Sequence, residues 1–298
     1  MKNRAPALLA VTGANIIYGL NYVIAKGIMP DFLHPRAIIF LRVFIATFVF
    51  WIVSLFLKSE KVGRRDLISF FIASVFGISL NQIMFFEGLN LTTSINASIL
   101  MVGIPIAVLG FSRILHHIPI TISKLIGIAL GTFGAVYLIL GYGTIDLSGK
   151  AFLGNIFILV NVTSYALFLV LIKPLTARYH PITIMKWIFL FGFVVVLPVT
   201  LPEAIKSDWS IIPFNIWISI LYVIIFATIM AYFLNNYSLT RMSAFANSAF
   251  IYSQPAIATL VAVFYGKEHL HYQQIVAAVF IFAGVYFVIR QRKRINEK

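Results

Sequence analysis

Residues 37–56 read AIIFLRVFIATFVFWIVSLF, twenty residues in which Arg42 carries the only charge. A helix needs about 20 mostly apolar residues to cross the hydrocarbon core of a bilayer, so this stretch is long enough to span a membrane. It shows no alternation of apolar and polar residues, which argues against the strands of a membrane β-barrel. Because hydrocarbon offers no partner to a backbone polar group, the stretch is predicted to be an α-helix.

The composition of the whole chain extends this prediction. Of its 298 residues, 61% are hydrophobic and 11% are charged, against roughly 45–50% and 25% in soluble globular domains. The chain contains 28 Phe, 13 Tyr and 4 Trp, an excess of aromatic residues that suits membrane–water interfaces. It contains no cysteine, which excludes disulfides, thiolate metal sites and cysteine nucleophiles. An all-α integral membrane protein is therefore predicted.

Apolar runs of sufficient length, divided by loops that are charged or rich in Gly, Pro and Asn, predict ten transmembrane helices. They cover residues 6–25, 36–57, 67–87, 93–112, 121–142, 151–172, 182–201, 213–236, 243–264 and 272–290. The narrowest division is the one at residues 88–92. The first run follows Lys2 and Arg4 as a signal peptide would, but its length and its two asparagines indicate an uncleaved first helix.

The positive charges predict how these helices are oriented. If the N-terminus is cytoplasmic, sixteen of the 23 Lys and Arg residues fall in cytoplasmic segments and five in external segments. This bias and the even number of spans predict that both termini are cytoplasmic (N-in/C-in), with residues 291–298 as a basic cytoplasmic tail. The net charge of +14 would then face anionic lipid headgroups. A nucleic-acid partner is accordingly not predicted.

Special residues recur at two fixed offsets and predict an internal repeat, residues 6–141 and residues 151–290. The matched pairs are His34-Pro35 with His180-Pro181 and Asn15 with Asn161 at an offset of 146, and Ser98 with Ser248, Pro105 with Pro255 and Gly134 with Gly284 at an offset of 150. Each half contains an odd number of spans, so the second copy must be inverted with respect to the first. Inverted repeats around a site near the midplane are typical of secondary transporters.

Several of these features together resemble the EamA family of the drug/metabolite transporter superfamily. They are the two five-helix halves, the asparagine in each opening helix, the His-Pro before the span that carries Arg42, and the prolines within the fourth and ninth spans. The resemblance covers nearly the whole chain and implies ten helices around a central cavity and the export of amino acids or other small metabolites. The family usually has a glutamate after each proline-bearing helix. Glu268 fits this pattern, whereas residues 113–117 of the first half contain no acid.

Polar side chains within the spans identify the residues expected to line the cavity, because such groups face the bundle interior or a water-filled path. The candidates are Asn15, Tyr18, Arg42, Asn161, Tyr165 and Gln254. Asn15 and Tyr18 share one helix face, and so do Asn161 and Tyr165. The alternative for each asparagine is a hydrogen bond to the backbone of a neighbouring helix. Many amides and phenols with few charges predict a neutral or zwitterionic substrate such as an amino acid.

The sequence leaves the roles of two charged residues open. Arg42 could hold a substrate carboxylate, pair with Glu87, or extend its charge to the membrane surface. Glu87, near the outer end of the third span, is the candidate for proton coupling. Its alternative role is that of a structural ion pair or an exposed loop carboxylate.

Two prolines within spans are the candidates for gating. Pro105 and Pro255 would each free the carbonyl four residues earlier, those of Met101 and Ile251. The alternative is an ordinary kink that helps the helices to pack. Asn235-Asn236, near the inner end of the eighth span, is assigned to a helix end rather than to the site.

Other classes of function find little support in the sequence. It contains no His-Glu-x-x-His, Gly-x-Ser-x-Gly or Gly-x4-Gly-Lys-Ser/Thr motif, so neither catalysis nor ATP-driven pumping is expected. His269 and His271 lack a third ligand, and no metal or other cofactor is predicted. The predicted partners are a small-molecule substrate and the lipid bilayer of the inner or plasma membrane, with the chain as a monomer or homodimer. A lipid or amphiphile flippase and a scaffold protein remain alternatives.

Overall fold

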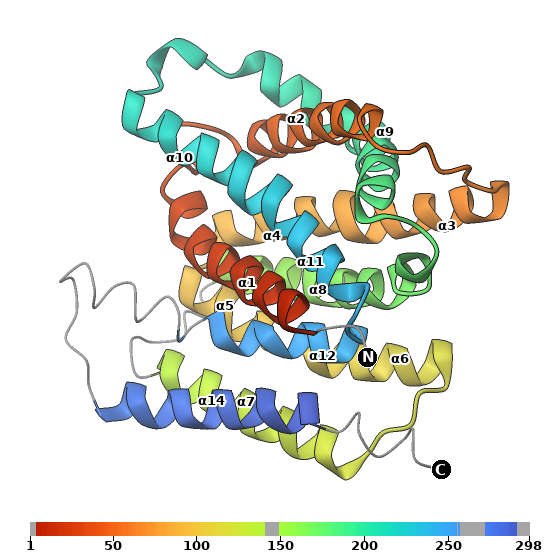
Figure 1. Cartoon of the computed structure of the whole chain (residues 1–298). Helices are drawn as coiled ribbons and strands as arrows, with labels where there is room; N and C mark the ends of the chain where they lie inside the picture. Colours follow the sequence, from red (N-terminus) through yellow and green to blue (C-terminus); the bar gives the residue numbers. More distant parts are fainter. Residues whose placement is uncertain (1–3, 141–148, 255, 257–271, 291–298) are drawn as a thin grey trace.

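The computed structural model describes residues 4–140, 149–254, 256 and 272–290, and every regular element in these ranges is helical (Figure 1). Seven helical segments are long and apolar enough to cross a membrane, and two shorter apolar helices accompany them. The protein is therefore an all-α, multi-pass membrane protein. Its helices are α1 (Ala5–Lys26), α2 (Pro35–Leu55), α3 (Arg64–Ser74), α4 (Leu80–Leu91), α5 (Ser94–Met101), α6 (Ile104–His116), α7 (Ile122–Leu140), α8 (Gly149–Ile172), α9 (Pro181–Lys206), α10 (Phe214–Ile224), α11 (Ala231–Leu239), α12 (Ala244–Ser248) and α14 (Tyr272–Arg290).

The two His-Pro dipeptides are matching helix caps. At the start of α2, Nδ1 of His34 accepts a hydrogen bond from the backbone N–H of Arg36 (3.2 Å). At the start of α9, Nδ1 of His180 accepts one from the N–H of Ile182 (3.3 Å). The proline that follows each histidine occupies the first helical position, where its missing N–H would have no partner in any case.

Four of the predicted spans are interrupted within the described residues, so the prediction of continuous α-helix was wrong for them. In the ninth, α12 passes into a 3-10 turn, η5 (Ala249–Tyr252). A π-helical turn, η1 (Val75–Ser79), joins α3 to α4, and a second, η4 (Ile225–Met230), joins α10 to α11. The two turns begin 150 residues apart. The predicted fourth span breaks between α5 and α6 just before Pro105, which has no N–H to continue the helix. Irregular turns of this kind are frequent at functional sites.

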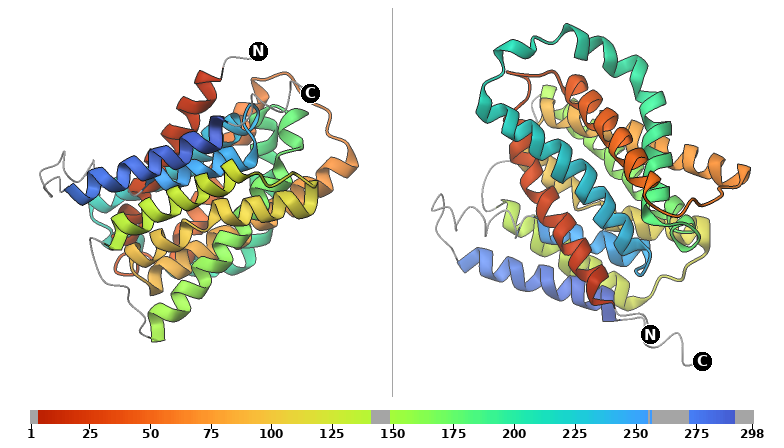
Figure 2. Two further views of the ribbon diagram at one scale, coloured as in Figure 1. Left: turned by 90° about the horizontal axis from the view of Figure 1, so that it is seen from below. Right: turned by 45° about the horizontal axis from the view of Figure 1, so that its top comes forward.

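Helices of the two predicted halves pack on each other in antiparallel pairs. In Figure 1, α2 and α9 lie together at the top and α7 and α14 at the bottom, and Figure 2 shows the same pairs from two other directions. Phe40 of α2 contacts Phe193 of α9, and further along α2 Trp51 contacts Trp187. Residue numbers therefore rise along α2 as they fall along α9. Between these two layers, α4 packs on α8 and α1 packs on α11.

The matched glycines lie where α7 and α14 approach each other most closely. A Cβ atom on Gly134 would come within 2.9 Å of the backbone nitrogen of Ile281, and one on Gly284 within 2.6 Å of the backbone nitrogen of Gly131. Ile281 and Gly131 are themselves 150 residues apart. The same contact is therefore made once from each helix, and only glycine fits it.

In each predicted half, one lysine caps the end of the third membrane segment. Nζ of Lys26, the last residue of α1, donates to the carbonyl oxygens of Leu89 (2.7 Å) and Thr92 (3.0 Å) at the end of α4. Nζ of Lys173, just after α8, donates to the carbonyl oxygen of Leu239 at the end of α11. Leu89 and Leu239 are 150 residues apart. These ammonium groups satisfy carbonyls that a helix end leaves without partners.

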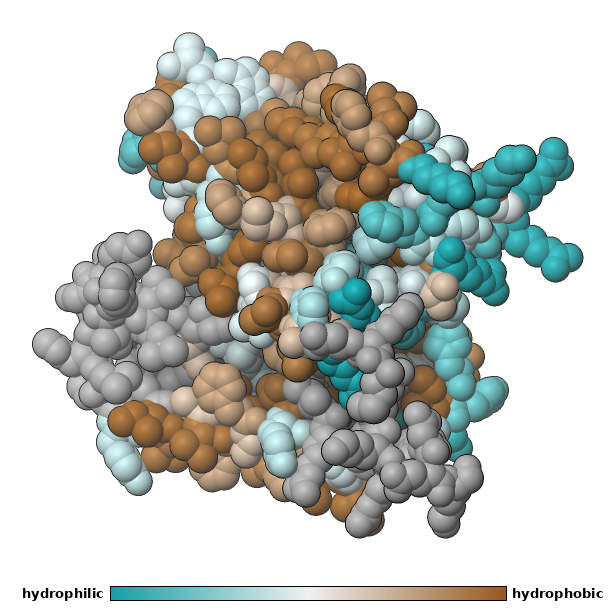
Figure 3. Space-filling view, viewed as in Figure 1, coloured by the Kyte–Doolittle hydropathy of each residue, from teal (hydrophilic) through white to brown (hydrophobic). Residues whose placement is uncertain are grey.

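Loops predicted to share one side of the membrane lie at one end of the molecule. NH1 of Arg178 is 2.9 Å from Oδ1 of Asp66, and a carboxylate oxygen of Glu60 accepts a hydrogen bond from the backbone N–H of His180 (3.0 Å). Figure 3 shows a polar surface at this end and an apolar surface over the helices beyond it. Exposed basic residues at this end are Lys58, Lys61, Arg64, Arg65, Arg113 and Arg178.

Candidate functional site

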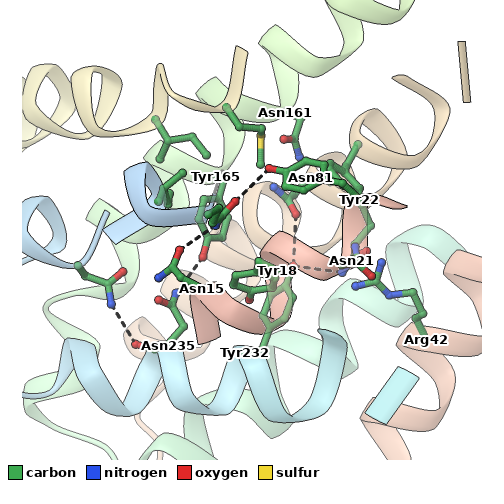
Figure 4. Close-up of a pocket in the computed structure, with 17 residues that line it drawn as sticks. Asn15, Tyr18, Asn21, Tyr22, Arg42, Asn81, Asn161, Tyr165, Tyr232 and Asn235 are labelled. Carbon is green, nitrogen blue, oxygen red and sulfur yellow. Dashed lines mark hydrogen bonds between the residues drawn. The ribbon is translucent and has the colours of Figure 1, made fainter. Parts of the chain in front are cut away.

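A cavity of about 70 Å³ lies between α1, α4, α8 and α11 (Figure 4). Asn15 and Asn161, on its wall, lie about halfway along α1 and α8. Eight amides, four tyrosines, four apolar side chains and one arginine line the cavity. All six cavity candidates from the sequence are among them: Asn15, Tyr18, Arg42, Asn161, Tyr165 and Gln254.

Gln254 connects the second half of the chain to α1. Its Nε2 donates to Oδ1 of Asn15 at 2.7 Å, and its Oε1 accepts a hydrogen bond from the hydroxyl of Tyr22 at 3.2 Å. Asn15 donates in turn to the carbonyl oxygen of Val11 at 2.8 Å. Asn15 is thereby held on both of its polar atoms, which orients it at the cavity wall.

A second group of hydrogen bonds connects α4, α8 and α11. The hydroxyl of Tyr232 accepts from Nε2 of Gln82 (3.1 Å) and donates to the carbonyl oxygen of Gly77 in η1 (3.1 Å). Nδ2 of Asn161 donates to the carbonyl oxygen of Asn81 (2.8 Å), which is the interhelical bond that the sequence left open. Oδ1 of Asn161 is buried and has no hydrogen-bond partner among the described residues. Asn161 therefore joins two helices and also presents an acceptor to the cavity.

The structure decides between the roles open to Arg42. Its side chain is 3% exposed, which rules out extension to the membrane surface, and Glu87 pairs with Arg36 instead (2.6 Å). Nε of Arg42 donates to Oγ1 of Thr228 at 2.6 Å, and its guanidinium lies 4.5 Å from the ring centre of Phe86. Within the described ranges it has no carboxylate partner. Glu87 does not line the cavity, and its role in proton coupling stays a prediction.

The residues preceding the two prolines lie at the cavity wall. Met101 and Ile251, the positions whose carbonyls the prolines were predicted to free, both line it. Pro105 is the second residue of α6, directly after the break. Pro255 and the tail 291–298 lie outside the described residues, and the gating role of both prolines stays a prediction.

Sequence reasoning missed part of the site. Asn235 does not belong to a frayed helix end: it is 4% exposed within α11 and donates to the hydroxyl of Tyr165 at 2.9 Å. Asn81 and Gln82 carried a detectable signal, two adjacent amides inside an apolar run. Further polar lining residues outside the predicted set are Asn21, Tyr22, Tyr232 and Asn247.

Comparison with known proteins agrees with this architecture. Over 302 residues the chain is 26% identical to the uncharacterized transporter YetK of Bacillus subtilis, covering 99% of this chain and 90% of that protein. It is 28% identical over 261 residues to an uncharacterized transporter of Archaeoglobus fulgidus (88% and 91% covered), and 23% identical over 313 residues to a WAT1-related protein of Arabidopsis thaliana (94% and 84% covered). One solved crystal structure has the same fold, with a TM-score of 0.76 over 99% of this chain and 100% of its own, at 17% identity.

The sequence profile of the EamA-like transporter family matches residues 5–140 and 152–290. Each match covers one half of the chain. The His-Pro caps, π turns and glycine contacts of the first half correspond to those of the second. The chain therefore belongs to the EamA-like transporter family.

Proposed function

We propose that this membrane transporter is a secondary carrier that moves a small neutral or zwitterionic metabolite, such as an amino acid, by alternating access, with export as its direction. The cavity carries the proposal, because it is polar, lies at mid-length of the membrane segments and takes its wall from both halves of the chain. Secondary transporters built from two repeats bind their substrates near the bilayer midplane, at the interface between the repeats. The inner or plasma membrane is the proposed location, and a monomer or homodimer the proposed assembly.

The proposal includes ten transmembrane helices in two inverted halves, residues 6–141 and 151–290, with both termini in the cytoplasm. An inverted repeat relates its halves by a two-fold axis in the membrane plane, so equivalent helices meet antiparallel. The antiparallel pairing of α2 with α9, the reciprocal glycine contacts of α7 and α14, and the matched π turns support this arrangement. The excess of basic residues in the segments assigned to the cytoplasm supports the orientation.

A carrier of amphiphiles is the second candidate, because an apolar groove opens between α4 and α8. Its wall includes Phe76, Leu80, Ile156, Leu159 and Val160. This groove shares no lining residue with the polar cavity. A solute in the cavity would therefore not need the groove, and the small-metabolite proposal is preferred.

Counterflow in proteoliposomes tests the proposed function. Vesicles containing the purified chain are loaded with one unlabelled solute at a time and diluted into the labelled solute, with and without a pH gradient. Saturable exchange of an amino acid or a similar metabolite is expected. Exchange of lysolipids but of no small metabolite would favour the amphiphile carrier, and no exchange by folded, inserted protein would contradict both.

A further inference from the structure

Arg42 is a buried cation whose counter-charge is missing from the described residues. It is 3% exposed and is the only ionisable group other than tyrosine that lines the cavity. The acidic side chains in the described ranges lie elsewhere: three pair with other basic residues, and none lines the cavity. A buried charge without a partner is costly, and inside a membrane it marks a functional site by default.

The surrounding residues hold one edge of the guanidinium and leave another edge available. Oγ1 of Thr228, in the π turn η4, accepts a hydrogen bond from Nε of Arg42 (2.6 Å). It donates to the carbonyl oxygen of Val223 (2.8 Å), five residues earlier in α10. NH2 makes only a long bond to the carbonyl oxygen of Ala227 (3.5 Å), and Phe86 covers one face. Among the described residues NH1 has no hydrogen-bond partner. Figure 4 shows the guanidinium directed towards the amide and phenol side chains of the cavity.

Three polar oxygens without partners among the described residues line the same cavity, and one of them is the hydroxyl of Tyr18. Oδ1 of Asn21 and Oδ1 of Asn161 are buried and make no hydrogen bond to any described residue. A buried acceptor of this kind calls for an N–H or O–H donor. One guanidinium edge and two amide oxygens are therefore complementary to a solute that carries a carboxylate and a hydrogen-bond donor close to it.

We propose that Arg42 binds the carboxylate of the substrate, so that the carrier takes α-amino or α-hydroxy acids and rejects analogues without a free carboxylate. This inference rests on the proposed transport function. It restricts the proposed zwitterionic substrates to α-amino acids and adds the anionic α-hydroxy acids, which the same site would hold. The NH1–NH2 edge offers the fork geometry that binds a carboxylate through both of its oxygens. Asn21 and Asn161 accept from the amino or hydroxyl group, and Thr228 is a positioning residue that holds the arginine.

Matched acid and amide probes test the proposal. Proteoliposomes are assayed for counterflow of alanine, leucine and phenylalanine, of the corresponding α-hydroxy acids, and of the corresponding amino-acid amides. The variants are Arg42→Gln, Arg42→Lys and Thr228→Val. Lys186→Gln is the control, because it removes another intramembrane cation, one that lies over Trp51 and Trp187 and not in the cavity. Size-exclusion profiles show which variants fold.

The wild-type chain is expected to exchange the amino acid and the α-hydroxy acid whose side chain fits the cavity. It is expected not to exchange the amide with the same side chain. Arg42→Gln is expected to lose roughly 10- to 100-fold in acid exchange, with Arg42→Lys in between and Lys186→Gln unchanged. Thr228→Val is expected to lower the preference for acid over amide. If Arg42→Gln does not fold, the melting temperature of the wild-type chain is measured with each probe. It is expected to rise with the acid and not with the matching amide.

Equal exchange of acid and amide by the wild type, or normal acid exchange by Arg42→Gln, would overturn the role of Arg42 and leave the carrier function standing. The same holds if the counterflow assay of the proposed function identifies a substrate that has no carboxylate. No exchange and no thermal shift with any solute, by folded wild-type protein, would overturn both proposals.

Discussion

Replacing Gly284 by alanine is expected to separate α14 from α7. The new Cβ would meet three backbone atoms of the neighbouring helix within 3 Å, the nearest being the nitrogen of Gly131 at 2.6 Å. Ordinary contacts begin at 3.4 Å, so the helices must move apart by about 0.8 Å. Backbone cannot rotate away as a side chain can, and a gap of ~0.5–1 Å forfeits a quarter to a half of the dispersion energy along the contact.

The magnitude follows from two opposing effects. Overpacking in a well-packed interior costs about 1–3 kcal/mol, while replacing glycine by alanine within a helix stabilises it by about 1 kcal/mol. Gly284→Ala is therefore expected to lower the free energy of unfolding by about 0–2 kcal/mol. Gly110→Ala is the matched control, because a Cβ at Gly110 in α6 meets nothing within 4 Å. It is expected to be neutral or to stabilise the protein by up to ~1 kcal/mol.

The free energy of unfolding is measured by titration of mixed micelles with sodium dodecyl sulfate, followed by tryptophan fluorescence and checked for reversibility. The helix gain is common to both variants, so they are expected to differ by the overpacking cost of about 1–3 kcal/mol, which corresponds to roughly 5- to 150-fold in the unfolding equilibrium. Gly134→Ala, at the equivalent position of α7, is expected to behave like Gly284→Ala. Equal stability of Gly284→Ala and Gly110→Ala would refute the close approach of the two helices and, with it, the reciprocal contact that supports the repeat.

Three further predictions concern the cavity and its ends. Asn15→Ala and Asn161→Ala are each expected to lower counterflow at least about tenfold, with an unchanged size-exclusion profile. Normal transport by both folded variants would mean that the cavity is assigned wrongly. Lys26→Met is expected to lower the free energy of unfolding by about 1 kcal/mol, because carbonyls at the end of α4 lose their ammonium donor. Lys150→Met, at an exposed position, is the control. An equal effect of the two substitutions would exclude the cap. If Glu87 couples transport to protons, Glu87→Gln is expected to abolish the stimulation of transport by a pH gradient. Stimulation equal to that of the wild type would mean that Glu87 only forms its ion pair with Arg36.

Much of the fold could be predicted because membrane insertion is governed by local properties of the chain. Every described membrane segment lies close to its predicted range, and the narrow division near residue 92 separates α4 from α5. The interruptions were not predictable in the same way. Residues 75–79 and 225–230 contain no proline, and the apolar pattern of a π turn differs little from that of an α-helix.

The sequence by itself determined that the chain is a helical membrane protein, where its helices lie and which polar residues within them to examine. These conclusions depend on hydropathy, spacing and the cost of leaving a polar group in hydrocarbon, and all three can be evaluated within one segment. Six of the cavity residues were found in this way. Only the tertiary structure decided their partners on other helices, because those bonds join residues that are distant along the chain. Arg42 bonds Thr228, 186 residues away, and not Glu87, since helix packing sets which side chains meet and hydropathy does not.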